Sequence, residues 1–100
     1  MQTYKIKSKF IDEEVVITKH KYGNGILALN LTSLEGEPIA TASVNLPEHA
    51  NVLKPSQTFI KNYSENEGIL ESLQKAGVVG PSLFQVSNGM IVVSAVEVLI

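Results

Sequence analysis

The sequence predicts an α+β domain: an antiparallel meander sheet of about six to seven strands with one helix, about residues 65–76, packed on one face. Short segments that alternate apolar and polar residues are separated by glycine-rich or polar turns, as in an antiparallel sheet. A single segment combines a helix-start signal with apolar residues at helical spacing. A chain of 100 residues has the size of one compact domain, so we assign residues 1–100 to a single domain.

The first half of the chain predicts four strands that form a meander with one buried face. Alternation is clearest over residues 26–33, where Leu27, Leu29 and Leu31 share one face. Asn24 and its flanking glycines precede this segment and are typical of a hairpin turn, because Asn and Gly tolerate positive φ. The other three expected strands cover residues 3–10, 14–22 and 39–46. Residues 48–56 are expected to form a loop, and residues 57–63 a short edge strand.

The helix is predicted from its first turn. Ser64 and Glu67 have the spacing of a capping box, in which each side chain bonds a free backbone N–H of that turn. One helix face would then carry Ile69, Leu70, Leu73 and Ala76. Gly68 lowers helix propensity by about 1 kcal/mol relative to Ala, and it indicates either close packing against the sheet or a frayed first turn.

The chain ends in a predicted hairpin, with strands over residues 82–86 and 90–99 around the turn signal Ser87-Asn88-Gly89. The last strand is apolar on both faces, with Val93 on one and Val92, Val96 and Val98 on the other. A strand of this kind is covered on both sides. We expect one face to pack under the helix and the other to pack on more sheet or on another subunit.

Composition excludes several classes of protein. The absence of cysteine excludes a disulfide scaffold, a zinc finger and a thiol nucleophile. All eight basic residues are lysines and the net charge is −2, which argues against a dedicated nucleic-acid reader. The N-terminus lacks the apolar core of a signal peptide, and the longest nearly apolar run, residues 90–100, is too short to span a bilayer. We expect a cytoplasmic protein with no membrane partner.

No group of residues predicts catalysis. His20 and His49 lack the spacing of a metal site, so no metal or cofactor is expected. The acids of residues 12–14 are typical of a turn, and Glu65 and Glu67 suit the positive end of a helix dipole. No motif of a serine nucleophile occurs. We therefore expect no catalytic residues and a protein that is not an enzyme.

Two groups of residues are candidates for contact with a partner. The first is a lysine face. If the first two strands pair as a hairpin, a single surface would gather Lys5, Lys7, Lys9, Lys19 and Lys21. Such a surface can attract phosphate or an acidic protein, or it can be a solvated edge that prevents aggregation.

The second candidate is the junction between strand and helix. It carries Asn62, Tyr63 and Asn66. Junctions of this kind often hold binding sites. The asparagines can equally satisfy the hydrogen bonds of the turn itself.

Two stretches of the chain resemble a known family. Residues 36–47, GEPIATASVNLP, are similar to a "GEP-x-AT-x-(S/T)-VNL" stretch, and residues 59–77 resemble a second block. The family is the domain of unknown function numbered 4313, and the resemblance covers about residues 22–84. It implies a small accessory protein of gut bacteria and their plasmids, conjugative elements and phages. It implies no catalytic residues.

These observations lead us to expect a non-enzymatic module that binds an unidentified protein partner, with a homo-oligomer as one form of that contact. The alternative is a nucleic-acid-associated protein that uses the lysine face. The third class is a small hydrolase or ligand-binding enzyme, which would need a concave pocket near Glu48, His49 and Asn62.

Overall fold

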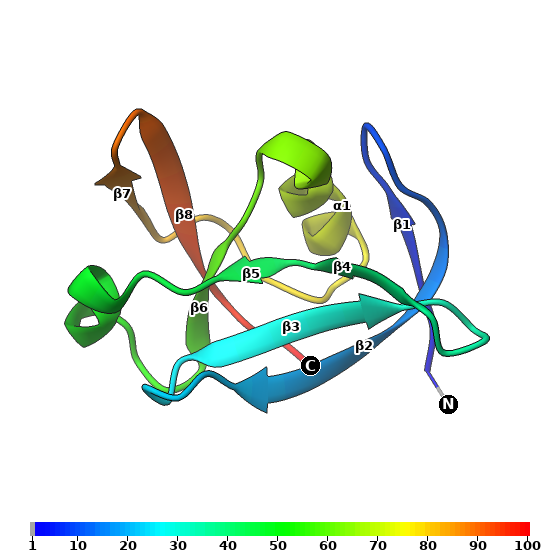
Figure 1. Cartoon of the computed structure of the whole chain (residues 1–100), viewed down its shortest axis with the longest axis horizontal. Helices are drawn as coiled ribbons and strands as arrows, with labels where there is room; N and C mark the ends of the chain where they lie inside the picture. The colour runs from blue at the N-terminus through cyan, green and yellow to red at the C-terminus, as the bar shows by residue number, and fades with distance from the viewer. Residues whose placement is uncertain (1) are drawn as a thin grey trace.

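The computed structural model describes residues 2–100, which form eight strands, one α-helix and two 3₁₀ segments (Figure 1). The strands are β1 (Tyr4–Lys7), β2 (Asp12–Lys21), β3 (Leu27–Thr32), β4 (Pro38–Thr41), β5 (Ser43–Val44), β6 (Gln57–Ile60), β7 (Phe84–Asn88) and β8 (Ile91–Glu97). The helical segments are η1 (Pro47–Val52), η2 (Ser64–Asn66) and α1 (Ile69–Lys75).

The strands form two antiparallel sheets of four, with the orders β1-β2-β3-β4 and β5-β6-β8-β7. The mixed α and β composition and the antiparallel pairing are as predicted, but the single meander sheet of six to seven strands is wrong. The chain changes sheet at Ala42, which is fully buried. Its N–H donates to Leu29 of β3, whereas its carbonyl accepts from Lys61 at the end of β6, both at 2.8 Å. One predicted strand, residues 39–46, is therefore divided between two sheets.

Strand β2 is shared between two partners along its length. Its first half, from Asp12 to Val15, pairs with β1, and its second half, from Val16 to Lys21, pairs with β3. Because a strand rises about 3.3 Å per residue, side chains at the two ends of β2 lie far apart. This sharing decides where the lysines of the N-terminal region lie.

Strand β6 is central, so the prediction of an edge strand over residues 57–63 is wrong. It lies between β5 and β8, and all four of its residues are buried. The Thr58 hydroxyl also donates to the carbonyl of Leu27 in β3 at 2.7 Å, which ties the second sheet to the first. Phe59 is fully buried.

Helix α1 begins later than the sequence predicts, at Ile69 rather than about residue 65, and it ends at Lys75. The predicted capping box does not form: Ser64 opens η2 with φ +57°, and its backbone carbonyl accepts from Glu67 N. Gly68 stands at the N-cap with φ +91° and lies against the backbone of Ser8 and Lys9. The expected close packing of Gly68 against the sheet is therefore wrong, because Gly68 precedes the helix and its neighbours belong to the β1–β2 connection.

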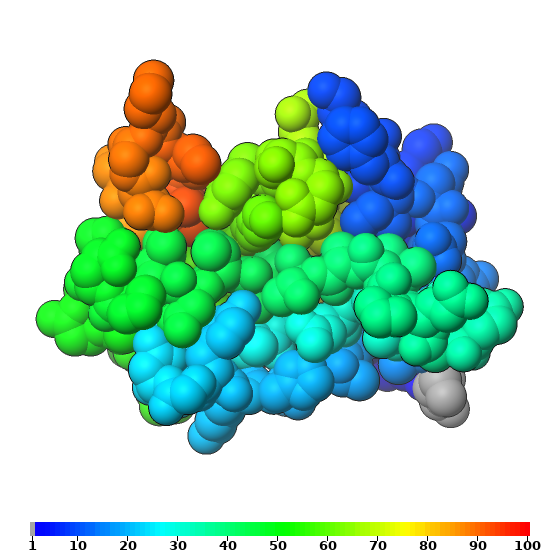
Figure 2. Space-filling model, viewed as in Figure 1, coloured from blue at the N-terminus to red at the C-terminus, as the bar shows by residue number. Residues whose placement is uncertain are grey.

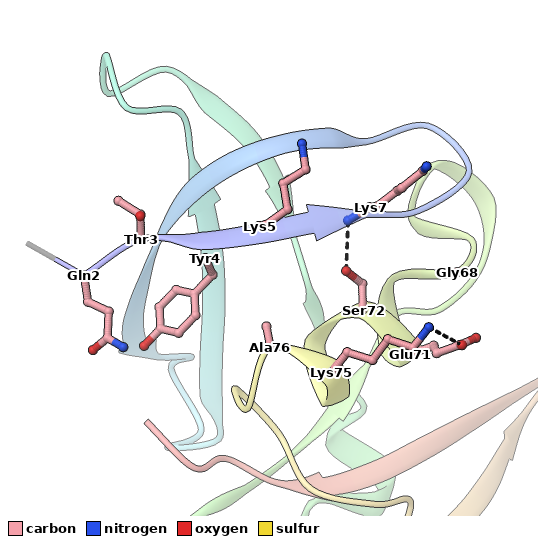
Figure 3. A pocket seen from close by; sticks show the side chains of 10 residues that line it. All are labelled: Gln2, Thr3, Tyr4, Lys5, Lys7, Gly68, Glu71, Ser72, Lys75 and Ala76. Atoms are coloured by element: carbon pink, nitrogen blue, oxygen red, sulfur yellow. Dashed lines mark hydrogen bonds and ion pairs between the residues drawn. The ribbon is translucent and has the colours of Figure 1, made fainter.

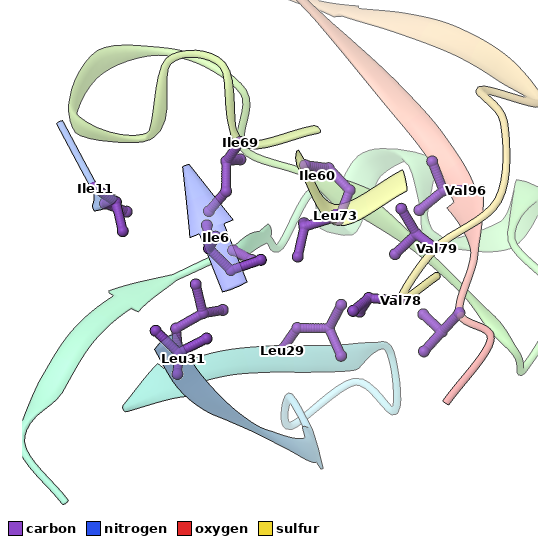
Figure 4. Packing of buried hydrophobic residues seen from close by; sticks show 13 residues of the cluster. Ile6, Ile11, Leu29, Leu31, Ile60, Ile69, Leu73, Val78, Val79 and Val96 are labelled. Carbon is purple, nitrogen blue, oxygen red and sulfur yellow. The ribbon is translucent and has the colours of Figure 1, made fainter. Parts of the chain in front are cut away.

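Two clusters of buried side chains make up the core. The larger lies between the first sheet, α1 and the end of β8, and Figure 4 shows Ile6, Leu29, Leu31 and Leu73 meeting in it. The smaller is formed by Leu46, Phe59, Val93 and Ala95. Strand β8 contributes to both, because Val96 and Val98 belong to the larger cluster. The prediction that β8 is covered on both faces therefore holds for Val93 to Val96 but not for Val92, which is 59% exposed.

Candidate functional site

The lysines of the N-terminal region do not form one surface. In the β1–β2 register Lys5 lies opposite Glu14 and Lys7 opposite Asp12, so these residues share one face of the pair. Along β2, Lys19 and Lys21 alternate with Glu14 and lie on the other face, opposite Leu29 and Leu27 of β3. The expected five-lysine surface therefore has Lys5 and Lys7 on one face of the β1–β2 pair, Lys19 and Lys21 on the other face at the far end of β2, and Lys9 in the connection outside both strands.

Acidic groups and backbone oxygens engage several of these lysines. Lys5 Nζ lies 2.8 Å from Asp12 Oδ1, and the hydrogen bond and charge of Lys5 lower the pKa of that carboxyl below its ordinary value. Lys9 Nζ lies 3.4 Å from Glu67 Oε2. Lys19 Nζ donates to the backbone oxygen of Ile100 at 2.6 Å. The side chains of Lys5, Lys9 and their acidic partners are more than half exposed, so these ion pairs are screened by water and contribute little to stability.

An open groove of about 670 Å³ lies between the N-terminal strand and α1 (Figure 3). Its lining includes Lys5, Lys7, Glu71, Ser72 and Lys75. Lys75 pairs with Glu71 at 3.0 Å, and the Ser72 hydroxyl oxygen accepts from the backbone N–H of Lys7 at 2.9 Å. Within residues 2–100, Lys7 is the one lysine of the groove with no ion-pair partner. The groove is therefore polar, but most of its charge is already compensated.

At the predicted junction site, Asn62 and Asn66 both bond backbone groups of the protein. Asn62 Oδ1 accepts from the backbone N–H of Leu70 at 2.9 Å, which supplies the helix-cap oxygen that Gly68 cannot. Asn66 is fully buried and donates from Nδ2 to the carbonyl of Thr41 at 2.7 Å. Tyr63 packs on the smaller core cluster. Each asparagine bonds a more distant part of the chain and not the turn itself, and the buried Asn66 Oδ1 has no hydrogen-bond partner within residues 2–100.

The pocket required for the enzyme hypothesis does not coincide with either depression described for the chain. The second depression, of about 310 Å³, lies near Lys21, Asn24 and Lys54. Neither it nor the groove beside α1 is lined by Glu48, His49 or Asn62. His49 instead lies edge-on to the Phe59 ring, with 6.4 Å between ring centroids.

The most exposed large apolar side chain, Met90, lies in the turn of the β7–β8 hairpin, and Phe10 of the β1–β2 connection, which is 65% exposed, comes next. Figure 2 shows the tip of this hairpin, in orange, projecting beyond the body of the molecule. Met90 at the tip is fully exposed, and Leu83 beside the start of β7 is about half exposed. Residues 76–96 contain no charged side chain, in a chain with 18% charged residues. This uncharged segment is the sequence signal that could have identified the hairpin as a candidate contact surface.

Three of the four outer strands are shielded or short. The backbone N–H of Lys7 in β1 is taken by Ser72 of α1, and β4 begins at Pro38, which offers no N–H. Strand β5 has only two residues, and its Ser43 hydroxyl is engaged by Leu29 N and Tyr22. Strand β7 is the longest of these four outer strands and has neither a proline nor a charged residue, the common protections of a sheet edge.

The outward hydrogen-bonding groups of β7 belong to Gln85 and Ser87. The two-residue turn Gly89–Met90 is flanked by the pair Asn88 and Ile91, which is the hydrogen-bonded pair that closes such a hairpin. Alternation then directs the backbone groups of Gln85 and Ser87 away from β8. His49 Nε2 lies 3.3 Å from the carbonyl oxygen of Ser87, which keeps a second lone pair. Gln85 and Ser87 are both exposed.

Comparison with known proteins gives no relative to draw on: no family model, curated protein or solved structure matches the chain. The resemblance to the domain of unknown function numbered 4313 stays a prediction. In residues 2–100, no group of three or more acidic or histidine side chains is arranged to hold a metal ion. No helix in this same range is long and apolar enough to cross a membrane.

Proposed function

We propose that the protein is a non-enzymatic binding module that receives an extended segment of a protein partner along the outer edge of β7. The observation that carries this proposal is the row of outward backbone groups of Gln85 and Ser87 on an exposed, uncharged edge strand. A sheet edge of this kind binds an extended chain through main-chain hydrogen bonds, and neighbouring side chains provide selectivity.

The exposed apolar residues of the hairpin support the same surface. Val92 is 59% exposed on β8, and Met90 lies at the hairpin tip. Burial of apolar area stabilises a complex by roughly 25 cal/mol per Å², so a partner that covers this part of the hairpin gains affinity beyond the hydrogen bonds. An uncharged surface selects partners by shape and backbone pairing more than by long-range attraction.

The nucleic-acid alternative depended on five lysines acting together. The placement of Lys5 and Lys7 on a different face from Lys19 and Lys21 argues against that alternative, and Lys5 and Lys75 of the groove are each paired with an acid. Nucleic-acid affinity grows with the number of phosphates that cations neutralise at once. We therefore favour the protein-binding surface of β7.

The proposal is tested by selecting random peptides, displayed on phage, against the immobilised protein. Selected peptides are then measured against two variants of one position. Gln85→Pro removes an outward N–H that the hairpin does not use, a place where an edge strand tolerates proline. Gln85→Ala keeps that N–H and controls for loss of the side chain, which donates to Ser94 Oγ.

We expect peptides that bind the wild type and Gln85→Ala, bind Gln85→Pro at least tenfold more weakly, and shift the amide resonances of β7. One lost interface hydrogen bond with the strain of a displaced strand accounts for a tenfold effect, about 1.4 kcal/mol. Failure to select any binding peptide, or selection of peptides that bind Gln85→Pro equally well, would contradict the proposal. Circular dichroism of each variant establishes that the fold is retained.

A further inference from the structure

We infer that two copies of this chain pair through their β7 strands, antiparallel about a two-fold axis at Val86, so that their two four-stranded sheets become one continuous sheet. This inference rests on the proposed function and names the partner of the β7 edge. It requires that the strand be complementary to itself, because a two-fold interface presents the same surface from both copies.

The outward backbone groups determine the register. Pairing Gln85 of one copy with Ser87 of the other, in both directions, uses the outward N–H and C=O groups of both residues, and the Ser87 carbonyl then accepts from the other copy beside its existing contact with His49 Nε2 at 3.3 Å. The two Val86 residues lie opposite each other, and their backbone groups stay paired with β8 of their own copies. A shift of two residues would instead pair Ser87 with Leu83, whose N–H already donates to the carbonyl of Ala95 at 2.8 Å. A shift the other way would place Gln85 opposite Gly89, which lies in the turn.

The uncharged edge of β7 favours a second copy of the same uncharged strand over a strongly charged strand of another protein. Residues 76–96 are uncharged, so two copies meet at β7 without like-charge repulsion, and a strongly charged strand would gain no ion pair there. In this register the Gln85 side chain of one copy lies opposite the Ser87 side chain of the other copy, and the two can hydrogen-bond as a cross-strand pair. The pairing therefore satisfies both the backbone and the side chains of the edge.

The same register brings exposed apolar groups near one another. The hairpin tip of each copy, which carries Met90, comes to lie beside the start of β7 in the other copy, where Leu83 is exposed. A five-residue strand gives a small interface, so we expect a dimer that dissociates on dilution. The population of such a dimer rises with protomer concentration.

The register makes a charge test specific. The double variant Q85K/S87K places lysine opposite lysine at both cross-strand pairs of the dimer. The double variant Q85K/S87E places lysine opposite glutamate at both pairs. Each variant loses the same Gln85 and Ser87 side chains and changes two exposed positions, so each is the matched control of the other. Sedimentation velocity over about a hundredfold range of concentration, reaching about 1 mM, measures dimer formation.

We expect the wild type to form a dimer as concentration rises. Q85K/S87K should dissociate at least tenfold more readily, and Q85K/S87E should dimerise at least as tightly as the wild type. A wild type that stays monomeric at about 1 mM, or double variants that sediment alike, would overturn the inference. Thermal unfolding followed by circular dichroism shows whether each variant is folded at the temperature of sedimentation.

This outcome is separable from that of the proposed function. A monomeric wild type that still selects peptides blocked by Gln85→Pro refutes the second copy as partner but retains the β7 edge as a binding surface. A monomer that selects no peptide refutes both. A dimer that Q85K/S87K disrupts and Q85K/S87E retains supports both.

Discussion

Substitution of Gly68 by alanine tests how the chain enters α1. Gly68 has φ +91°, a backbone conformation that costs a residue with a Cβ about 1–2 kcal/mol. A Cβ built there would lie 3.5 Å from Lys9 N and 3.6 Å from Ser8, which are ordinary contacts and add no clash. Alanine also lowers the conformational entropy of the unfolded chain, which raises the free energy of unfolding by about 0.5–1 kcal/mol. The net expected loss is about 1 kcal/mol, or about 5 °C in Tm for a domain of this size.

Urea unfolding of Gly68→Ala, followed by circular dichroism, measures this loss. Gly23→Ala is the matched control, because Gly23 has no positive φ and nothing lies within 4 Å of its added Cβ. Ser64→Gly is the opposite substitution, made at φ +57°, and we expect it to stabilise the protein by about 0.5 kcal/mol. The reasoning is refuted if Gly68→Ala is as stable as the wild type, or if Gly23→Ala loses as much stability as Gly68→Ala.

Two further predictions concern the helix cap and Glu97 at the end of β8. Asn62→Ala should lower the free energy of unfolding by about 1 kcal/mol, because Leu70 N loses its acceptor. Asn62→Asp should keep most of the wild-type stability, because its carboxylate can still accept that hydrogen bond. Urea unfolding measures both variants, and an equal loss of stability in the two would contradict the cap. The pKa of Glu97 is lowered below 4.5 by hydrogen bonds from the Ser56 hydroxyl and the Gln57 amide and by the charge of Lys54. The ionised Glu97 carboxylate therefore adds to the free energy of unfolding above pH 4.5, and this addition is lost as the pH falls through the pKa of Glu97 in the folded protein. Urea midpoints measured from neutral pH to about pH 3 should therefore fall less for Glu97→Gln than for the wild type, and identical pH profiles would disprove this.

The strand segments were predictable because local pattern encodes them. Alternation around Leu27, Leu29 and Leu31 identified β3, and Asn24 with its neighbouring glycines identified the turn before it. The prediction of the helix start failed because Ser64 and Glu67 have capping-box spacing, but Asn62, eight residues before Leu70, supplies the cap instead. The spacing does not show which of several polar side chains reaches the free N–H groups.

The candidate lysine site was less predictable than the strands. The lysine positions and their alternation are local, but the register of β1 on β2 depends on the length and shape of the connection at residues 8–11. That register places Lys5 opposite Glu14 and leaves Lys19 and Lys21 on the other side of β2. The β7 edge was visible in the sequence only as an uncharged segment, because being an edge is a property of the whole sheet.

The sequence by itself determined where most strands lie, that a tight turn near Asn88-Gly89 joins the last two strands, and that residues 76–96 are uncharged, since each follows from the side chains of neighbouring residues. The tertiary structure decided that Ala42 passes the chain from one sheet to another, that β6 is central and that β7 is an outer strand. These features depend on which distant backbone groups pair. Every strand offers the same N–H and C=O groups, so pairing is settled by packing of the whole core.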